Sequence, residues 1–243
     1  MKHTALTALL LLLFITAMGQ SQSNSWLRLS VEMPLAPKLN SVIEWQSRAQ
    51  GFENGGLITS PLLHSVRPWL NYKIQENTTL SLSPIAYYYL YPVTISPKDQ
   101  SKPAQQEWRT TVAVEQRWPL TQRFSLQSRT GLEFRNFSRQ QDVIRVRQKF
   151  GMDYCLSPQV HVLAYDEVMA NLYAGSFFEQ NRLGAGVSFQ LNKALGVETG
   201  YLYINRALPF YQGLLNQHVL YINIRLRFFR RFSAATGGGE TLR

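Results

Sequence analysis

The sequence is poor in cysteine, in charged residues and in long hydrophobic runs. Its single cysteine, Cys155, excludes a fold held together by internal disulfides. Charged residues make up 16% of the 243 residues, whereas about a quarter is usual in a soluble domain. Hydrophobic residues make up 45%, which excludes an intrinsically disordered chain, because that class combines many charges with few apolar residues.

The one long apolar run covers residues 5–15. A helix that crosses a bilayer needs about 20 apolar residues, so this run is too short for a membrane anchor. Lys2 precedes the run, and the small residues Ala17 and Gly19 follow it. This order is typical of a secretory signal peptide, here residues 1–19, with cleavage before Gln20.

Most of the remaining chain alternates between apolar and polar residues, which is the pattern of half-buried β-strands. In one such run, Trp108, Val112 and Val114 alternate with Arg109 and Glu115. Five runs have one face without charge: residues 108–118, 124–135, 144–154, 182–191 and 220–228. Six further segments are predicted as strands: residues 26–33, 41–49, 63–74, 79–91, 159–172 and 195–205.

The connections between these segments differ in length. Short ones at residues 75–78, 119–122, 156–158 and 192–194 alternate with longer ones at 51–61, 92–105, 173–179 and 206–216. Long strands with one uncharged face and such connections are typical of a transmembrane β-barrel. We therefore predict an all-β fold, an antiparallel transmembrane barrel of ten to twelve strands over residues 20–232, followed by a disordered tail, 233–243.

Two features depart from this pattern. Eleven strands are predicted, whereas bacterial outer-membrane barrels usually have an even number, so we expect one element to be missed or miscounted. Leu202 and Ile204 fall on the face that carries charge in the other strands. A β-bulge near Gly200 or an error in register would explain their position.

The predicted lipid face is free of charge in the five clear runs, as a bilayer requires. Aromatic side chains near the strand ends are expected in the headgroup layer: Trp45, Trp108, Trp118, Tyr87 and Tyr88. These features favour the outer membrane of a Gram-negative type envelope, with membrane lipid and the barrel-assembly machinery as expected partners. The alternative is a soluble periplasmic lipid-binding barrel, apolar inside and charged outside, which usually has shorter strands.

Charged side chains gather on the face predicted to line the lumen. They are Arg109, Arg117, Arg129, Arg135, Arg145, Arg147, Arg182, Arg225 and Arg227, with Glu107, Glu115, Glu133, Asp153 and Glu167. One interpretation is a buried ion-pair network that fills the lumen, giving a structural or narrow transport role. The other is a site where excess arginine attracts a small anionic solute or a lipid phosphate. No nucleic-acid partner is expected, because these arginines alternate along strands and form no exposed patch.

Catalytic motifs are scarce. The histidines after the signal peptide, His64, His161 and His218, have no metal-ligand spacing, so no metal or cofactor is predicted. Ser65 or Ser176 with His161 would suit an outer-membrane lipid-modifying enzyme, but no G-x-S-x-G motif supports it and no catalytic residue is assigned. The segment Gly184-Ala185-Gly186 is expected to let side chains from neighbouring strands approach closely.

Several short segments along the chain form a recognisable set. They are Trp26-Leu27, Arg67-Pro68-Trp69-Leu70-Asn71-Tyr72-Lys73, Glu107-Trp108-Arg109, Tyr165-Asp166-Glu167 with Asn171, Gln180-Asn181-Arg182-Leu183, Val197-Glu198-Thr199-Gly200-Tyr201 and His218-Val219-Leu220. In these segments the chain resembles a bacterial family of unassigned activity, domain of unknown function twenty-four ninety. The resemblance implies a secreted outer-membrane β-barrel. Here Trp69 and Asp166 stand where the family pattern has Gly and Asn, and the tail beyond Phe228 is longer than usual.

Overall fold

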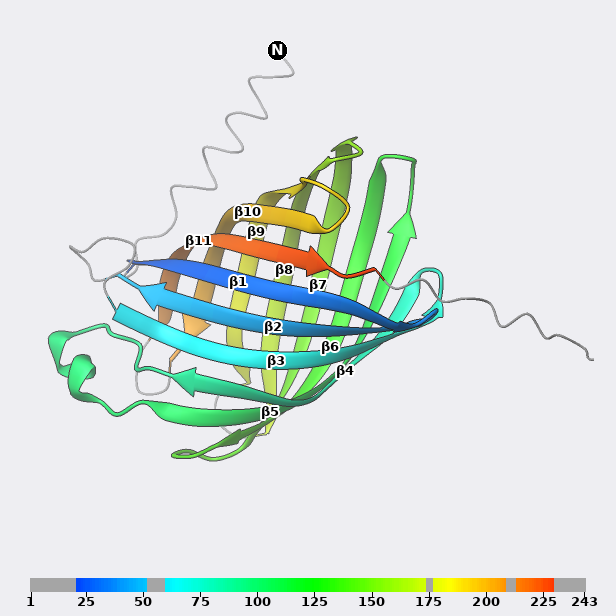
Figure 1. The fold of residues 1–243 in the computed structure, drawn as a ribbon. Coiled ribbons are helices and arrows are strands. Elements are labelled where there is room, and N and C mark those ends of the chain that lie inside the picture. The colour runs from blue at the N-terminus through cyan, green and yellow to red at the C-terminus, as the bar shows by residue number, and fades with distance from the viewer. Residues whose placement is uncertain (1–20, 52–59, 174–176, 209–212, 230–243) are drawn as a thin grey trace, which may run out of the picture.

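The computed structural model describes residues 21–51, 60–173, 177–208 and 213–229. The predicted signal peptide, its cleavage site and the predicted tail lie outside these residues. Eleven strands form one closed barrel, which confirms the predicted all-β barrel (Figure 1). The strands are β1 (Ser21–Ala36), β2 (Leu39–Gln50), β3 (Ser60–Gln75), β4 (Thr78–Leu90), β5 (Gln105–Pro119), β6 (Phe124–Phe137), β7 (Val143–Ser157), β8 (Val160–Tyr173), β9 (Phe178–Gln190), β10 (Leu195–Ala207) and β11 (Leu214–Arg227).

Each strand pairs antiparallel with its neighbours in sequence, and β1 pairs parallel with β11 to close the barrel. The parallel pair extends from Ser21 opposite Asn216 to Glu32 opposite Arg227. An odd number of strands that run alternately up and down must bring the first and last together in the same direction. The expectation that one of the eleven elements was miscounted is therefore wrong, and the barrel is antiparallel everywhere except at this seam.

The two mouths of the barrel differ. Connections at one mouth have two to four residues: 37–38, 76–77, 120–123, 158–159 and 191–194. Those at the other mouth are 51–59, 91–104, 138–142, 174–177 and 208–213. The predicted asymmetry is present, although 174–177 is no longer than the longest short turn. β1 begins at the mouth with the longer connections, and β11 ends at the opposite mouth (Figure 1).

A short 3-10 helix, η1 (Pro97–Ser101), lies in connection 91–104. The part of this connection just before η1 is attached to the barrel wall: the Thr94 amide donates to Gln50 Oε1 at 3.0 Å, and Gln22 Nε2 donates to the Thr94 carbonyl at 3.2 Å. In the described parts of the chain, no helix is long and apolar enough to cross a membrane.

The two faces of the barrel wall have opposite character. Ile85, Phe150 and Leu183 are more than half exposed on the outer face. Leu202 and Ile204, in contrast, are buried inside. Strand β10 keeps continuous register with both of its neighbours, so the suggested bulge or register error at this strand is wrong. Leu202 and Ile204 face an apolar part of the interior, so their inward position needs no irregularity in the strand.

Candidate functional site

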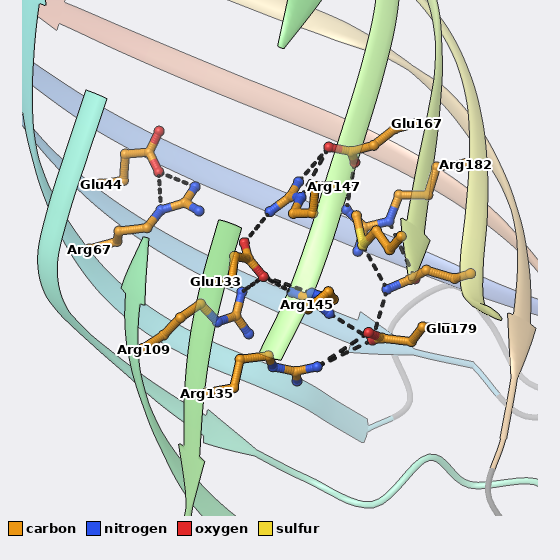
Figure 2. Close-up of polar contacts among 12 residues, drawn as sticks. Glu44, Arg67, Arg109, Glu133, Arg135, Arg145, Arg147, Glu167, Glu179 and Arg182 are labelled. Atoms are coloured by element: carbon orange, nitrogen blue, oxygen red, sulfur yellow. Dashed lines mark hydrogen bonds and ion pairs between the residues drawn. The ribbon is translucent and has the colours of Figure 1, made fainter. Parts of the chain in front are cut away.

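Six charged side chains form a closed ring of alternating sign inside the barrel. In order around the ring they are Glu107, Arg109, Glu133, Arg145, Glu179 and Arg135. Glu107 accepts from Arg109 at 2.6 Å and from Arg135 at 2.8 Å. Glu133 bonds to Arg145 and lies 3.4 Å from Arg109 (Figure 2). Glu107 and Glu133 are 0% exposed, so their charges depend on guanidinium partners and not on water.

Glu179 closes this ring from the far side, with oxygens 2.7 Å from Arg145 and 3.4 Å from Arg135. Its strand, β9, is not a neighbour of β6 or β7, so the ring spans the interior and does not merely follow the wall (Figure 2). Glu179 was not predicted as a site residue. A register shift between Met169 and Ala170 leaves Glu179 without a partner in the pairing of β8 with β9. Because of this shift, the Glu179 side chain points inward, whereas simple alternation would point it outward.

The ring continues into a second group through Arg147. This guanidinium lies 2.8 Å from Glu133 and 2.6 Å from Glu167, and Glu167 in turn lies 3.2 Å from Arg182. Together with the ring, these contacts give five arginines and four glutamates in one connected network. We name this set the ion-pair network. The network therefore carries one excess positive charge.

The other predicted lumen charges lie outside the ion-pair network. Arg129 pairs with Glu115 at 3.0 Å, and Arg117 pairs with Asp153 at 3.4 Å. Arg227 pairs with Glu32 of β1 at 3.0 Å, across the parallel seam. Arg225 is exposed. These pairs are partly hydrated and contribute about 0–1 kcal/mol each to stability, unlike the buried ring.

A further, partly buried pair, Glu44 with Arg67, was not predicted. The Trp69 indole also donates to Glu44 at 3.3 Å. The alternation of β2 and β3 does contain the signal, because Glu44 is flanked by the exposed residues Ile43 and Trp45.

The five predicted interfacial aromatics differ in their burial. Trp45, Trp108 and Trp118 are exposed, and the Tyr87 ring lies 4.8 Å from that of Trp108. Tyr88 is buried, with the Arg109 guanidinium 3.9 Å above its ring. The interfacial position expected for Tyr88 is therefore wrong. A register shift between Ser83 and Ala86 reverses the alternation of β4, so Tyr88 faces inward although Leu82 is exposed.

The interior near the seam is apolar. Its core consists of Trp26, Leu202, Ile204, Val219 and Tyr221, with Tyr165 packed against it. We name this set the seam cluster. A Cβ on Gly184 would lie 2.5 Å from the Tyr165 ring and 2.8 Å from Leu202, so the close approach predicted for Gly184-Ala185-Gly186 is confirmed.

The predicted catalytic pairings do not form among the described residues. Ser65 is buried on the interior face of β3, and the adjacent His64 takes the opposite face and packs against Tyr91. His161 bonds to Asp153 at 2.9 Å and His218 to Tyr201 at 2.5 Å. Ser176 lies outside the described residues. In the part of the chain that the structure describes, no group of three or more His, Cys, Asp or Glu residues is arranged to hold a metal ion.

Connection 91–104 contains a polar anchor of its own. Asp99 lies 2.5 Å from the Lys102 ammonium and accepts from the Ser96 and Ile95 amides at 2.7 and 3.0 Å. The bond from Lys102, followed by that from the Ser96 amide, lowers the pKa of Asp99 from 3.8 to about 2. The carboxylate thus stays charged and holds η1 in place at neutral pH.

A small cavity of about 50 Å³ lies between the ion-pair network and the mouth with short turns. It is lined by Glu115, Gln127, Ser128, Arg129, Lys149 and Gly151. This volume accommodates a few water molecules and no larger solute.

Comparison with known families identifies the chain. The model of the family described as Protein of unknown function (DUF2490) matches residues 23–209. The chain belongs to this family. The resemblance inferred from the short segments is therefore confirmed, although His218 lies beyond the matched residues. No curated protein sequence matches the chain.

Two solved structures similar to this family member are porins. A NanC porin is 8% identical, with a TM-score of 0.46, over 81% of this chain and 93% of the porin. An anion-selective porin from Comamonas acidovorans is 10% identical, with a TM-score of 0.38, over 79% of this chain. The match spans about half of that second porin, 54% of its chain.

Proposed function

We propose that the protein is an outer-membrane β-barrel with a structural or narrow transport role, whose lumen is crossed by the ion-pair network. The observation that carries this proposal is the sorting of charge: a closed wall with paired charges inside and large apolar side chains outside. In hydrocarbon every backbone polar group needs a partner, and a closed barrel has no free edge. Strands of 12 to 16 residues are long enough to cross a bilayer when tilted.

A soluble lipid-binding barrel, the alternative, would need the opposite sorting. Its ligand cavity would be apolar and its outer face charged. Here Glu107, Glu133 and Arg145 are buried inside, whereas Val112 and Phe150 are exposed. An acidic residue does occur on the outer face: Asp166, which accepts from Asn181 at 2.5 Å.

The ion-pair network argues for a narrow path through the lumen. The buried Arg109 and Arg145, held between carboxylates on β5, β6 and β9, leave little free space at their level. Because arginines exceed glutamates in the network, small anions are favoured over cations as solutes. The assembly machinery and surrounding lipids are partners that this location would require.

A pair of matched substitutions tests the location. Val112 and Gln116 are both exposed on the outer face of β5, with Val112 nearer the middle of the strand. In a bilayer, Val112→Arg should cost about 2–4 kcal/mol, and Gln116→Arg about 0–1 kcal/mol, because the cost depends on depth. Unfolding by urea in phospholipid vesicles measures both values. Equal, negligible costs, together with release of the unmodified chain from cells without detergent, would contradict the proposal.

A further inference from the structure

A second group of arginines lies inside the barrel next to the seam cluster. The Arg48 guanidinium stacks 3.7 Å from the centre of the Trp26 ring, and the Arg182 guanidinium lies 5.2 Å from the same centre. Arg182 and Arg206 both donate to Gln180 Oε1 at 3.4 Å. Three arginines from β2, β9 and β10 therefore converge on one side of the interior.

This group has less negative than positive charge around it. Within the described residues, the carboxylate at salt-bridge distance is that of Glu167, which lies 3.2 Å from Arg182 and is shared with Arg147. Glu179 also attracts Arg206, but its carboxylate is already paired with Arg135 and Arg145. Within the described residues, the Arg48 and Arg206 guanidiniums donate to the amide oxygens of glutamines and to no carboxylate. Each also has a buried Nε that finds no acceptor in the described structure. Buried guanidinium groups are stable when a counter-charge or acceptor satisfies them.

Neutral donors beside these arginines are also unsatisfied. Asn24 is 0% exposed, and neither atom of its side-chain amide has a hydrogen-bond partner in the described residues. The Trp26 indole nitrogen is likewise buried without an acceptor. Asn24 lies two residues before Trp26 on the same face of β1, and Trp26 pairs with Arg48 in the ladder. Unused donors therefore surround a region that has excess positive charge.

We propose that Arg48, Arg182 and Arg206, with Trp26 and Asn24, form a binding site for one small oxyanion. The ligand would be the carboxylate or phosphate group of a soluble ion. Planar guanidinium groups match such oxyanions with paired hydrogen bonds, and the indole and amide N–H groups supply neutral donors. The inference rests on the proposed function in one respect, that solutes reach the lumen; it does not require that they pass through.

Calorimetric titration of the full chain in maltoside micelles tests the site, with sodium phosphate and sodium acetate as probes. We expect saturable binding of at least one anion with one site per chain. Arg48→Gln and Arg206→Gln should each weaken it by about tenfold or more, in line with the loss of a charge-assisted hydrogen bond. Arg225→Gln is the matched control, because it removes the same charge from an exposed position and should leave the affinity unchanged.

Several outcomes would overturn the inference. These are no saturable binding of either probe, or equal affinities for the Arg48→Gln, Arg206→Gln and Arg225→Gln proteins. Displacement of bound phosphate by phosphatidylglycerol at micellar concentrations would assign the site to a lipid headgroup and contradict a soluble ligand. The heat-dependent gel mobility of each variant shows whether the barrel has formed. A barrel that inserts into vesicles but binds neither anion would refute this site alone, and anion binding without insertion would refute only the membrane location.

Discussion

The interior of this barrel is filled in two different ways. Around β5, β6 and β7, opposite charges alternate in the ion-pair network, and each carboxylate contacts two or more guanidiniums. Around β1, β10 and β11, the seam cluster packs an indole and a phenol ring against aliphatic side chains and glycine. The first region depends on charge balance and the second on shape, so they should fail under different substitutions.

The largest effect is expected from Glu133→Gln. This change leaves Arg109, Arg145 and Arg147 with one carboxylate fewer in a buried site, and breaking such a buried pair costs about 3–5 kcal/mol. Urea unfolding in vesicles measures the loss. Glu115→Gln is the control, because the Glu115–Arg129 pair is 44% and 31% exposed and its removal should cost about 1 kcal/mol or less. Equal losses for both variants would show that the ring has no special contribution.

The seam cluster should be most sensitive to added volume. A Cβ on Gly200 would lie 2.7 Å from the Gly186 Cα and also too close to the Ala185 carbonyl oxygen, and backbone atoms cannot easily move away. Gly200→Ala should therefore cost about 1–3 kcal/mol. Gly131→Ala, in β6, is the control, because its Cβ would meet Ala113 Cβ at an ordinary 3.6 Å. If both alanine variants are as stable as the parent protein, close packing at Gly200 does not contribute to the stability of the seam cluster.

The smallest expected effect lies outside both regions, in connection 91–104. The folded-state pKa of Asp99, about 2, is below its ordinary value of 3.8, so its contribution is present above about pH 4 and is lost as pH falls towards 2. Carboxyl chemical shifts of Asp99 would give this titration directly. In Lys102→Met the pKa should rise towards 3.8, because the largest cause of the shift has been removed. An unchanged pKa in this variant would contradict the assigned role of Lys102.

The sequence predicted the charged region better than the apolar one, for a physical reason. Strand side chains alternate with a period of two, so Arg109, Glu133 and Arg145 could be placed inside from their apolar neighbours alone. Leu202 and Ile204 broke the rule that inward residues are polar, and nothing in β10 indicates that β1 supplies Trp26 to pack against them.

Local irregularities account for other differences. Glu179 joins the ion-pair network because of a register shift between β8 and β9, and alternation carries no signal of such a shift. Tyr88 belongs to three consecutive tyrosines, so residue type alone could not show which ring turns inward. The parallel pairing of β1 with β11 was not predicted, because the residue pattern of a strand does not show which distant strand it pairs with.

That seam has a consequence for how the barrel assembles. Every other strand pair joins neighbours in sequence, whereas Trp26 opposite Tyr221 joins strands from the two ends of the described barrel. A parallel pair cannot form as a hairpin, and contacts so distant in sequence form slowly. We expect the sheet to grow hairpin by hairpin and to close last at β1 and β11. Since Trp26 contacts residues of β10 and β11, its burial would report the moment at which the sheet becomes a barrel.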